Sequence, residues 1–131
     1  MVRHEITKRL PEFEFVHDKM LYSKGCDCSH RRRIDHRIQI KNTMLAIETD
    51  EFAHVGYNKH DEEIRYDDVA MIFSGKWVWI RFNPHSNKER REEKTVFRHK
   101  LQVLIQTIKH NIIRIQHEEN KDMCEIIKLF Y

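Results

Sequence analysis

The chain has few of the residues that interrupt or cross-link a fold: three glycines, two prolines and three cysteines among 131 residues. It contains neither internal repeats nor a low-complexity segment. An odd number of cysteines does not make a disulfide framework, so we expect a reducing compartment, the cytosol or the nucleus. No run of about 18 apolar residues occurs, so no membrane span is expected. The first ten residues lack the apolar core of a secretion signal.

The composition indicates one folded domain, residues 1–131. Hydrophobic residues make up 40% of the chain and charged residues 34%, and the length fits a single core. The net charge is only +3, but residues 1–33 hold eight Lys or Arg against five acids, residues 88–100 six against three, and residues 59–70 two against five. This order suits a polyanion-binding surface around an acidic centre, although an ordinary mixed surface has the same charges.

Two neighbouring stretches have the two-residue period of β-strands. In residues 34–40, Ile34, His36, Ile38 and Ile40 share one face, and residues 45–50 place Glu48 and Asp50 opposite an apolar face. Residues 41–44, "KNTM", predict the turn of a hairpin. We further expect a short strand near the end of residues 13–22, a buried strand at 76–83 and a last strand in "MCEIIKLFY".

Two helices are expected between the later strands. Residues 59–73 have early acids that suit a helix N-terminus, and residues 95–117 carry an apolar stripe of helical period. The order β-β-β-α-β-α-β predicts an α/β sandwich around one mixed sheet.

The hairpin places acidic side chains together. With Ile40 opposite Leu45, both apolar faces coincide, Asp35 lies across from Asp50, and Glu48 shares their face. Directly opposed residues have Cβ atoms about 5 Å apart, and carboxylates that close repel one another unless a cation lies between them. Mg²⁺ prefers oxygen ligands, completed by phosphate and water. The alternative is that these acids face solvent, paired with Arg37 and Lys41.

Several spaced motifs carry a family resemblance. The segments "CDCSHRRRIDH", "LAIETDEFAH", "WIRFNP" and "KLFY", between about His17 and Tyr131, resemble the stand-alone PD-(D/E)XK nucleases encoded by giant DNA viruses. The resemblance implies the restriction-endonuclease-like fold, a central mixed sheet with a catalytic hairpin flanked by helices. It also implies hydrolysis of DNA phosphodiester bonds with Mg²⁺ or Mn²⁺, in the cytoplasm or nucleus of an infected host cell.

The resemblance assigns roles to the hairpin acids. Asp35 matches the Asp of the "PD" element, with Ile34 in place of the Pro, and Glu48 matches the acid of the (D/E)XK element. Asp50 stands where the pattern has Lys, so Asp35, Glu48 and Asp50 become the expected metal ligands. The missing Lys removes the usual water-polarising cation and favours two metal ions or another base. His54 and His36 are candidates for that base, since His titrates near neutrality.

Basic residues flank these acids. The expected contacts to DNA are Arg31, Arg32, Arg33, Arg37, Lys88, Arg90 and Arg91, which would neutralise phosphates without reading sequence. Arg81 and Asn83 end the buried strand and could orient metal ligands, touch phosphate or cap the strand. Solvated charged loops would look the same.

Two other metal-linked readings remain open. Cys26 and Cys28, with His30 and His17, could hold zinc, although Cys-x-Cys is closer than the usual zinc spacing. An HNH-type nuclease can be drawn from His36, Asn42, His54, Asn58 and His60, but it leaves the alternating strands and the acid pair unexplained.

The sequence therefore predicts a small Mg²⁺-dependent DNA endonuclease that binds mainly the backbone. Cutting both strands would require a homodimer or two visits. The alternative is a nuclease-fold module that binds nucleic acid or a partner protein without cleavage, and a nicking or mismatch-repair role cannot be separated from general cleavage.

Overall fold

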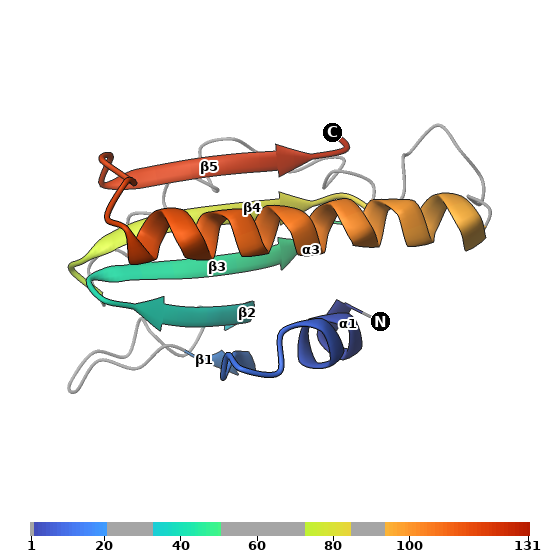
Figure 1. The fold of residues 1–131 in the computed structure, drawn as a ribbon, viewed down its shortest axis with the longest axis horizontal. Coiled ribbons are helices and arrows are strands. Elements are labelled where there is room, and N and C mark those ends of the chain that lie inside the picture. Colours follow the sequence, from blue (N-terminus) through green and yellow to red (C-terminus); the bar gives the residue numbers. More distant parts are fainter. Residues whose placement is uncertain (1, 21–32, 51–72, 85–93) are drawn as a thin grey trace.

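The structure is a computed structural model, and it describes residues 2–20, 33–50, 73–84 and 94–131. Within these ranges the chain forms a five-stranded sheet and two helices (Figure 1). The elements are α1 (Val2–Arg9), β1 (Val16–Met20), β2 (Arg33–Ile40), β3 (Thr43–Thr49), β4 (Lys76–Phe82), α3 (Lys94–Gln116) and β5 (Cys124–Leu129). In this part of the chain, no helix is long and apolar enough to cross a membrane.

The sheet is mixed, as predicted. Its strands lie in sequence order from β1 to β5. β2 is antiparallel to both of its neighbours, whereas β3, β4 and β5 are parallel to one another. Parallel neighbours need a long crossover, and α3 provides the one between β4 and β5. The helix expected at 59–73 falls, apart from Phe73, outside the described residues. The three parallel strands consequently end at one edge of the sheet.

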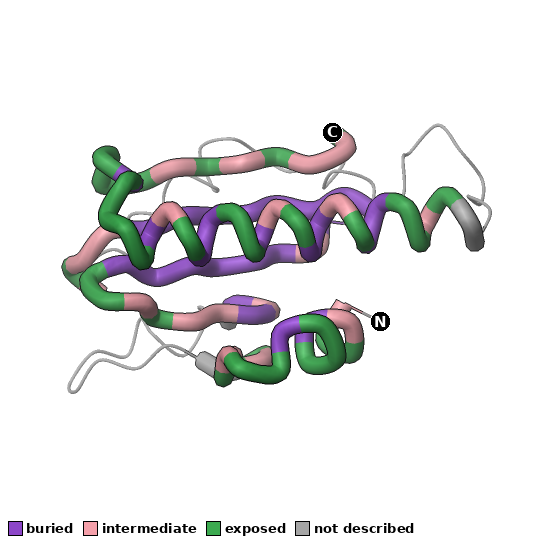
Figure 2. Tube along the Cα trace, in the orientation of Figure 1, coloured by how far each residue is buried: buried purple, intermediate pink, exposed green. Residues whose placement is uncertain are grey.

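Both described helices cover the same face of the sheet (Figure 1). The predicted stripe of α3 is buried there, and α1 adds Ile6 and Leu10. Their partners on the sheet are Leu45, Ile47, Val78, Ile80 and Phe82. Figure 2 shows that β3 and β4 are buried along most of their length, whereas β5 alternates between intermediate and exposed residues.

Helix α1 was not predicted from the sequence. It has eight residues, of which Ile6 alone is buried within the helix, so it carries no apolar period long enough to recognise. Its packing against α3 and the sheet, rather than its own pattern, explains why it forms. The chain therefore has a helix before the first strand, which corrects the predicted element order.

The opposite face of the sheet carries a second apolar cluster. It consists of Ile34, Met44, Ala46, Trp77 and Trp79, with Phe73 packed against them. The two indole rings stack with their centroids 5.2 Å apart, so both tryptophans belong to the core. Ile34 was expected on the face of Ile38 and Ile40, but these two pack with the first cluster. The alternation of β2 therefore breaks between Ile34 and Ile38.

The β2–β3 register differs from the prediction by two residues. Ile38, not Ile40, lies opposite Leu45, and Ile40 lies opposite Thr43. The turn consists of two residues rather than four, because Lys41 adopts a left-handed conformation with φ of 54°, as two-residue hairpin turns require. A shift of two residues keeps each side chain on its face but changes its partners.

Strand β4 starts against this turn. The Lys76 amide donates a hydrogen bond to the Asn42 carbonyl oxygen over 2.8 Å. A Cβ atom on Gly75 would lie 2.2 Å from that same oxygen and 2.7 Å from ring atoms of Phe73. Glycine is therefore required at position 75 by close approach of the backbone.

Candidate active site

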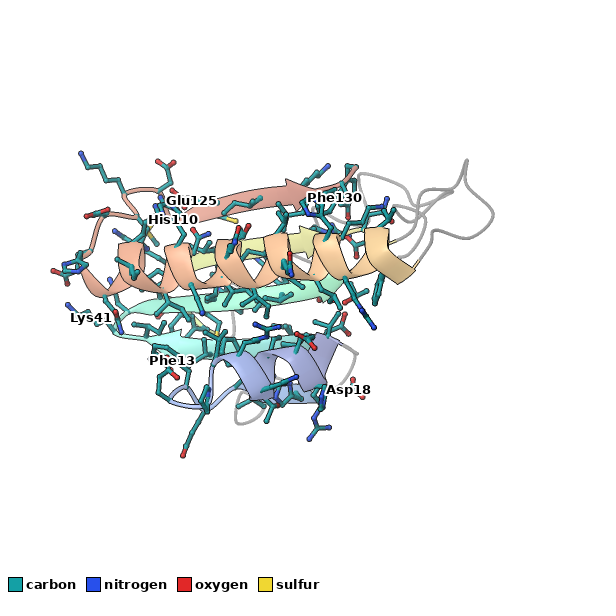
Figure 3. All side chains as sticks on the ribbon, turned by 45° about the vertical axis from the view of Figure 1, so that its right-hand side comes forward. Phe13, Asp18, Lys41, His110, Glu125 and Phe130 are labelled. Carbon is teal, nitrogen blue, oxygen red and sulfur yellow. The ribbon has the colours of Figure 1, made fainter. Side chains whose placement is uncertain are left out.

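The carboxyl ends of the parallel strands bring several polar side chains together. Asp50 follows β3, Asn83 follows β4, and Tyr131 lies two residues after β5. The Asp50 amide donates to the Phe82 carbonyl (2.7 Å) and the Asn83 amide to the Leu129 carbonyl (3.0 Å), so the three strands stay aligned past their ends. Ligands in open α/β sheets bind at such carboxyl ends. In Figure 3 this edge, where Phe130 is labelled, lies at the end of the sheet opposite the hairpin turn marked by Lys41.

Glu48 and Arg81 are buried side by side on the second face. They are partners in the parallel β3–β4 register, and they are 6% and 2% exposed. Glu48 lies two residues after Ala46 on β3, and Arg81 lies two residues after Trp79 on β4. Both side chains are therefore on the face of the second cluster, which contains Ala46 and Trp79. A buried carboxylate is costly unless a positive charge lies near it. The sequence predicted both residues as functional, and the fold brings them together.

Arg81 and Tyr131 both donate to the carboxylate of Asp50. Its side chain is 1% exposed, and its Oδ2 accepts a hydrogen bond from Nε of Arg81 at 2.5 Å. The hydroxyl of Tyr131 donates to the same oxygen. Sequence reasoning missed Tyr131 because it lies 81 residues from Asp50. Tyr131 ends the "KLFY" segment that carries part of the resemblance, and that segment was the signal that could have found it.

Asp35 reaches the same edge from β2. The printed β2–β3 pairs end at His36 and Ile47, and beyond them the Oδ2 of Asp35 accepts a hydrogen bond from the Thr49 amide at 2.8 Å. The carboxylate thus takes the place of a backbone acceptor, beside the peptide that joins Glu48 to Thr49. The predicted pairing of Asp35 with Asp50 is wrong, because the β2–β3 register is shifted by two residues and the Asp35 carboxylate instead accepts from the Thr49 amide.

In the predicted register, with Ile40 opposite Leu45, Arg37 would lie across from Glu48. It lies opposite Ala46 rather than Glu48, because of the same register shift. The side chain is half-buried, and burial lowers the pKa of its guanidinium.

His36 forms a close pair with His17. The two residues are opposite each other on β1 and β2, and their Nδ1 atoms lie 2.8 Å apart. Burial lowers the pKa of His36 to about 4, with the neighbouring His17 adding to the effect and Asp35 opposing it. Burial and Arg3 also lower the pKa of His17. His36 is therefore neutral near pH 7 and engaged with His17, which makes it a poor candidate for the proton-transfer group.

Asn83 is nearly fully buried, at 3% exposure, and its side-chain nitrogen donates to the Phe130 carbonyl oxygen over 3.0 Å. Its Oδ1 has no hydrogen-bond partner, the one such buried side-chain atom among the described residues. Asn83 thus ties β4 to β5 and leaves an acceptor at the carboxyl edge.

The predicted three-acid metal centre does not form as such. Among the described residues, no three His, Cys, Asp or Glu side chains are grouped so that they could hold a metal ion. Mg²⁺ needs only one or two carboxylates when phosphate and water complete its shell. Asp35 and Glu48 fit that smaller set, since the Asp35 carboxylate lies at the peptide that follows Glu48. Asp50 fits it less well, because Arg81 and Tyr131 bind its carboxylate.

Several expected site residues lie outside the described residues. These are Cys26, Cys28, His30, Arg31, Arg32, His54, Lys88, Arg90 and Arg91. Arg33 begins β2, and its backbone pairs with Met20. The zinc site, the HNH reading, the base role of His54 and most of the phosphate contacts therefore stay predictions.

A concave basic surface lies between α1 and α3. Its cavity of about 380 Å³ is lined by Lys8, Arg9 and Arg98 together with Glu5, Leu101 and Gln102. Arg9 pairs with Glu5 at 3.5 Å, so the lining keeps an excess of positive charge. Such a surface can neutralise phosphates.

No family model matches this chain, and neither a curated protein nor a solved structure resembles it closely enough to be counted as a match.

Proposed function

We propose that this protein is a metal-dependent DNA endonuclease of the PD-(D/E)XK type. The observation that carries the proposal is the position of the Asp35 carboxylate. It lies on the peptide that follows Glu48, at the carboxyl edge where Arg81 is also buried. The hairpin supplies an acid from each of its strands, and the adjacent parallel strand supplies a cation. Such groups at one place can hold a metal ion and stabilise charge during phosphodiester hydrolysis.

The mixed sheet supports the same proposal. The hairpin β2–β3 carries Asp35 and Glu48, and β4 lies parallel to β3. The restriction-endonuclease-like fold requires such a hairpin in a mixed sheet flanked by helices. The described helices both cover the face opposite Glu48 and Arg81.

The residues have separate tasks in this proposal. Asp35 and Glu48 would hold a Mg²⁺ or Mn²⁺ ion, which when bound would stabilise negative charge on the phosphate. The Thr49 amide fixes the orientation of the Asp35 carboxylate. In hydrolysis, the oxygen of water forms a new P–O bond, one ester P–O bond breaks, and the proton that water gives up ends on the oxygen of the leaving alcohol. The basic surface of Lys8, Arg9 and Arg98 would add contacts to the DNA backbone.

A cleavage assay tests this function. Plasmid, branched and single-stranded DNA are incubated with Mg²⁺ or Mn²⁺, with and without EDTA. We expect metal-dependent cleavage that Asp35→Asn and Glu48→Gln abolish. Glu125→Gln is the matched control. Glu125 lies on the edge strand β5, away from the proposed ligands, and pairs there with Arg114 of α3. Cleavage that survives either acid substitution would overturn the assignment of the ligands.

The second candidate is a nuclease-fold module that binds nucleic acid without cleaving it. The engagement of Asp50 by Arg81 and Tyr131 favours it, because position 50 then offers neither the lysine of the nuclease pattern nor an open carboxylate. This candidate predicts DNA binding with no effect of Mg²⁺ on the Thr49 amide signal in an NMR titration. A metal-dependent shift of that signal contradicts it.

A further inference from the structure

Asp50 raises a question that the three-acid model does not answer. In the nuclease pattern, position 50 holds a lysine, and here it holds an acid with an arginine bound to it. The side chains of Arg81 and Asp50 are 3% and 1% exposed. A buried arginine needs an anion, and Asp50 supplies it in contact with Nε. The positive charge missing from position 50 is thus present on the neighbouring strand.

The geometry fixes where this cation lies. Nε of Arg81 binds Asp50, and Arg81 is the register partner of Glu48 on β3. Glu48 and Asp50 are two residues apart on one strand, so they share a face. The planar guanidinium can reach two neighbouring carboxylates because its donors point in fixed directions. The hydroxyl of Tyr131 donates to Asp50 and so holds this partner of Arg81 in place.

We infer that Arg81 is the fixed positive charge of this site and that Asp50 and Tyr131 are residues that position it beside Glu48. Asp50 is therefore the counter-ion of the Arg81 guanidinium and is not a metal ligand. This inference rests on the proposed function and deepens it. With Asp50 bound to Arg81, the carboxylates proposed to hold metal are Asp35 and Glu48. Two carboxylates completed by phosphate and water suit one divalent ion, in place of the two that an acid at position 50 suggested.

The role has kinetic consequences that a purely structural role does not. A preorganised cation stabilises charge that develops during phosphoryl transfer. Arg81→Met should lower kcat by about 10²- to 10³-fold, the usual loss for one such group. Tyr131→Phe should lower kcat by about 10- to 100-fold, as for residues that orient a site, with KM nearly unchanged. Guanidinium ion at low millimolar concentration should partly restore cleavage by Arg81→Ala, and equal sodium chloride should not.

A spectroscopic experiment separates this inference from the proposed function. The Nε–H signal of Arg81 is followed by ¹⁵N NMR during a Mg²⁺ titration, with the Thr49 amide as the reporter for metal at Asp35. We expect the Thr49 signal to move and the Arg81 signal to persist at its hydrogen-bonded position. Mn²⁺ electron paramagnetic resonance should count one ion per chain. Loss of the Arg81 signal on metal binding, or two bound ions, would show that Asp50 is a ligand and overturn the inference.

The variants decide the remaining outcomes. If Mg²⁺ moves neither the Thr49 nor the Arg81 signal, the proposed nuclease function fails. Spectra of the metal-free variants then test whether Asp50 and Tyr131 position Arg81. Asp50→Asn and Tyr131→Phe must each shift the Arg81 signal, and spectra unchanged by both would refute it. Lys128→Met is the control for Tyr131, since Lys128 lies over the face of the Tyr131 ring, 5.3 Å from its centroid. This variant should leave both kcat and the Arg81 signal unchanged.

Discussion

Replacing Asp50 by Asn distinguishes two physical pictures of the acidic edge. If Asp50 were one of three crowded carboxylates, removing its charge would relieve repulsion and stabilise the metal-free protein. In the structure, Asp50 is instead the buried counter-ion of Arg81. Removing one partner of a buried ion pair costs about 3–5 kcal/mol, because the other charge stays buried alone. For a chain of this length, that corresponds to a loss of roughly 10–20 °C in Tm.

Urea unfolding measures this effect directly. Trp77 and Trp79 are buried next to the site, so their fluorescence reports the transition. We expect Asp50→Asn to lower the free energy of unfolding by about 3–5 kcal/mol. The double variant Asp50→Asn with Arg81→Met should recover part of that loss, because no lone charge remains. An Asp50→Asn protein as stable as the wild type would refute the ion-pair picture.

Three further predictions follow from other contacts. The pKa of His36 is about 4 in the folded protein, against 6.5 for an exposed histidine. As the pH falls, the unfolded chain therefore takes up the extra proton before the folded chain does. The free energy of unfolding should therefore fall by up to ~3 kcal/mol between pH 6.5 and pH 4, measured by urea midpoints. Asp35→Asn should cost only about 1 kcal/mol in urea unfolding, through the weakened bond to the Thr49 amide. Gly75→Ala should lower stability by about 2–3 kcal/mol in thermal unfolding, because its Cβ would collide with the Asn42 carbonyl oxygen.

Each of these predictions can fail clearly. The variant His36→Gln is the pH control, and its stability should fall less below pH 6.5 than that of the wild type. Equal pH profiles for the two proteins would contradict the lowered pKa. A loss above 3 kcal/mol in Asp35→Asn would mean that the carboxylate has a larger structural role. An unchanged Tm in Gly75→Ala would contradict the close approach at the start of β4.

The sequence predicted the sheet well because its strands have strong periods. The strand at 76–83, the helix at 95–117 and the hairpin all lie within about two residues of β4, α3 and β2–β3. Alternation places residues on a face but does not choose between registers that differ by two. Only the left-handed conformation of Lys41 decides the turn length, and lysine is not a residue that signals it.

The sequence predicted most residues of the candidate site but few of the contacts between them. Glu48, Asp50 and Arg81, each named as a candidate from the sequence, lie together at one edge of the sheet. Their pairing depends on which strands are neighbours and parallel, and a single sequence does not contain that information. Tyr131 was missed for the same reason, since nothing near it in the chain points to Asp50.

The long sequence separation within the Asp50 cluster has a consequence for the order of folding. The hairpin β2–β3 closes over a two-residue turn, so it can form early, while Asp50 is still hydrated. Arg81 lies 31 residues away and Tyr131 lies 81 away, and closing such loops costs entropy before any contact repays it. Burial of Asp50 therefore belongs to the late, native side of the folding barrier. Substitutions at Asp50, Arg81 or Tyr131 should then speed unfolding far more than they slow folding.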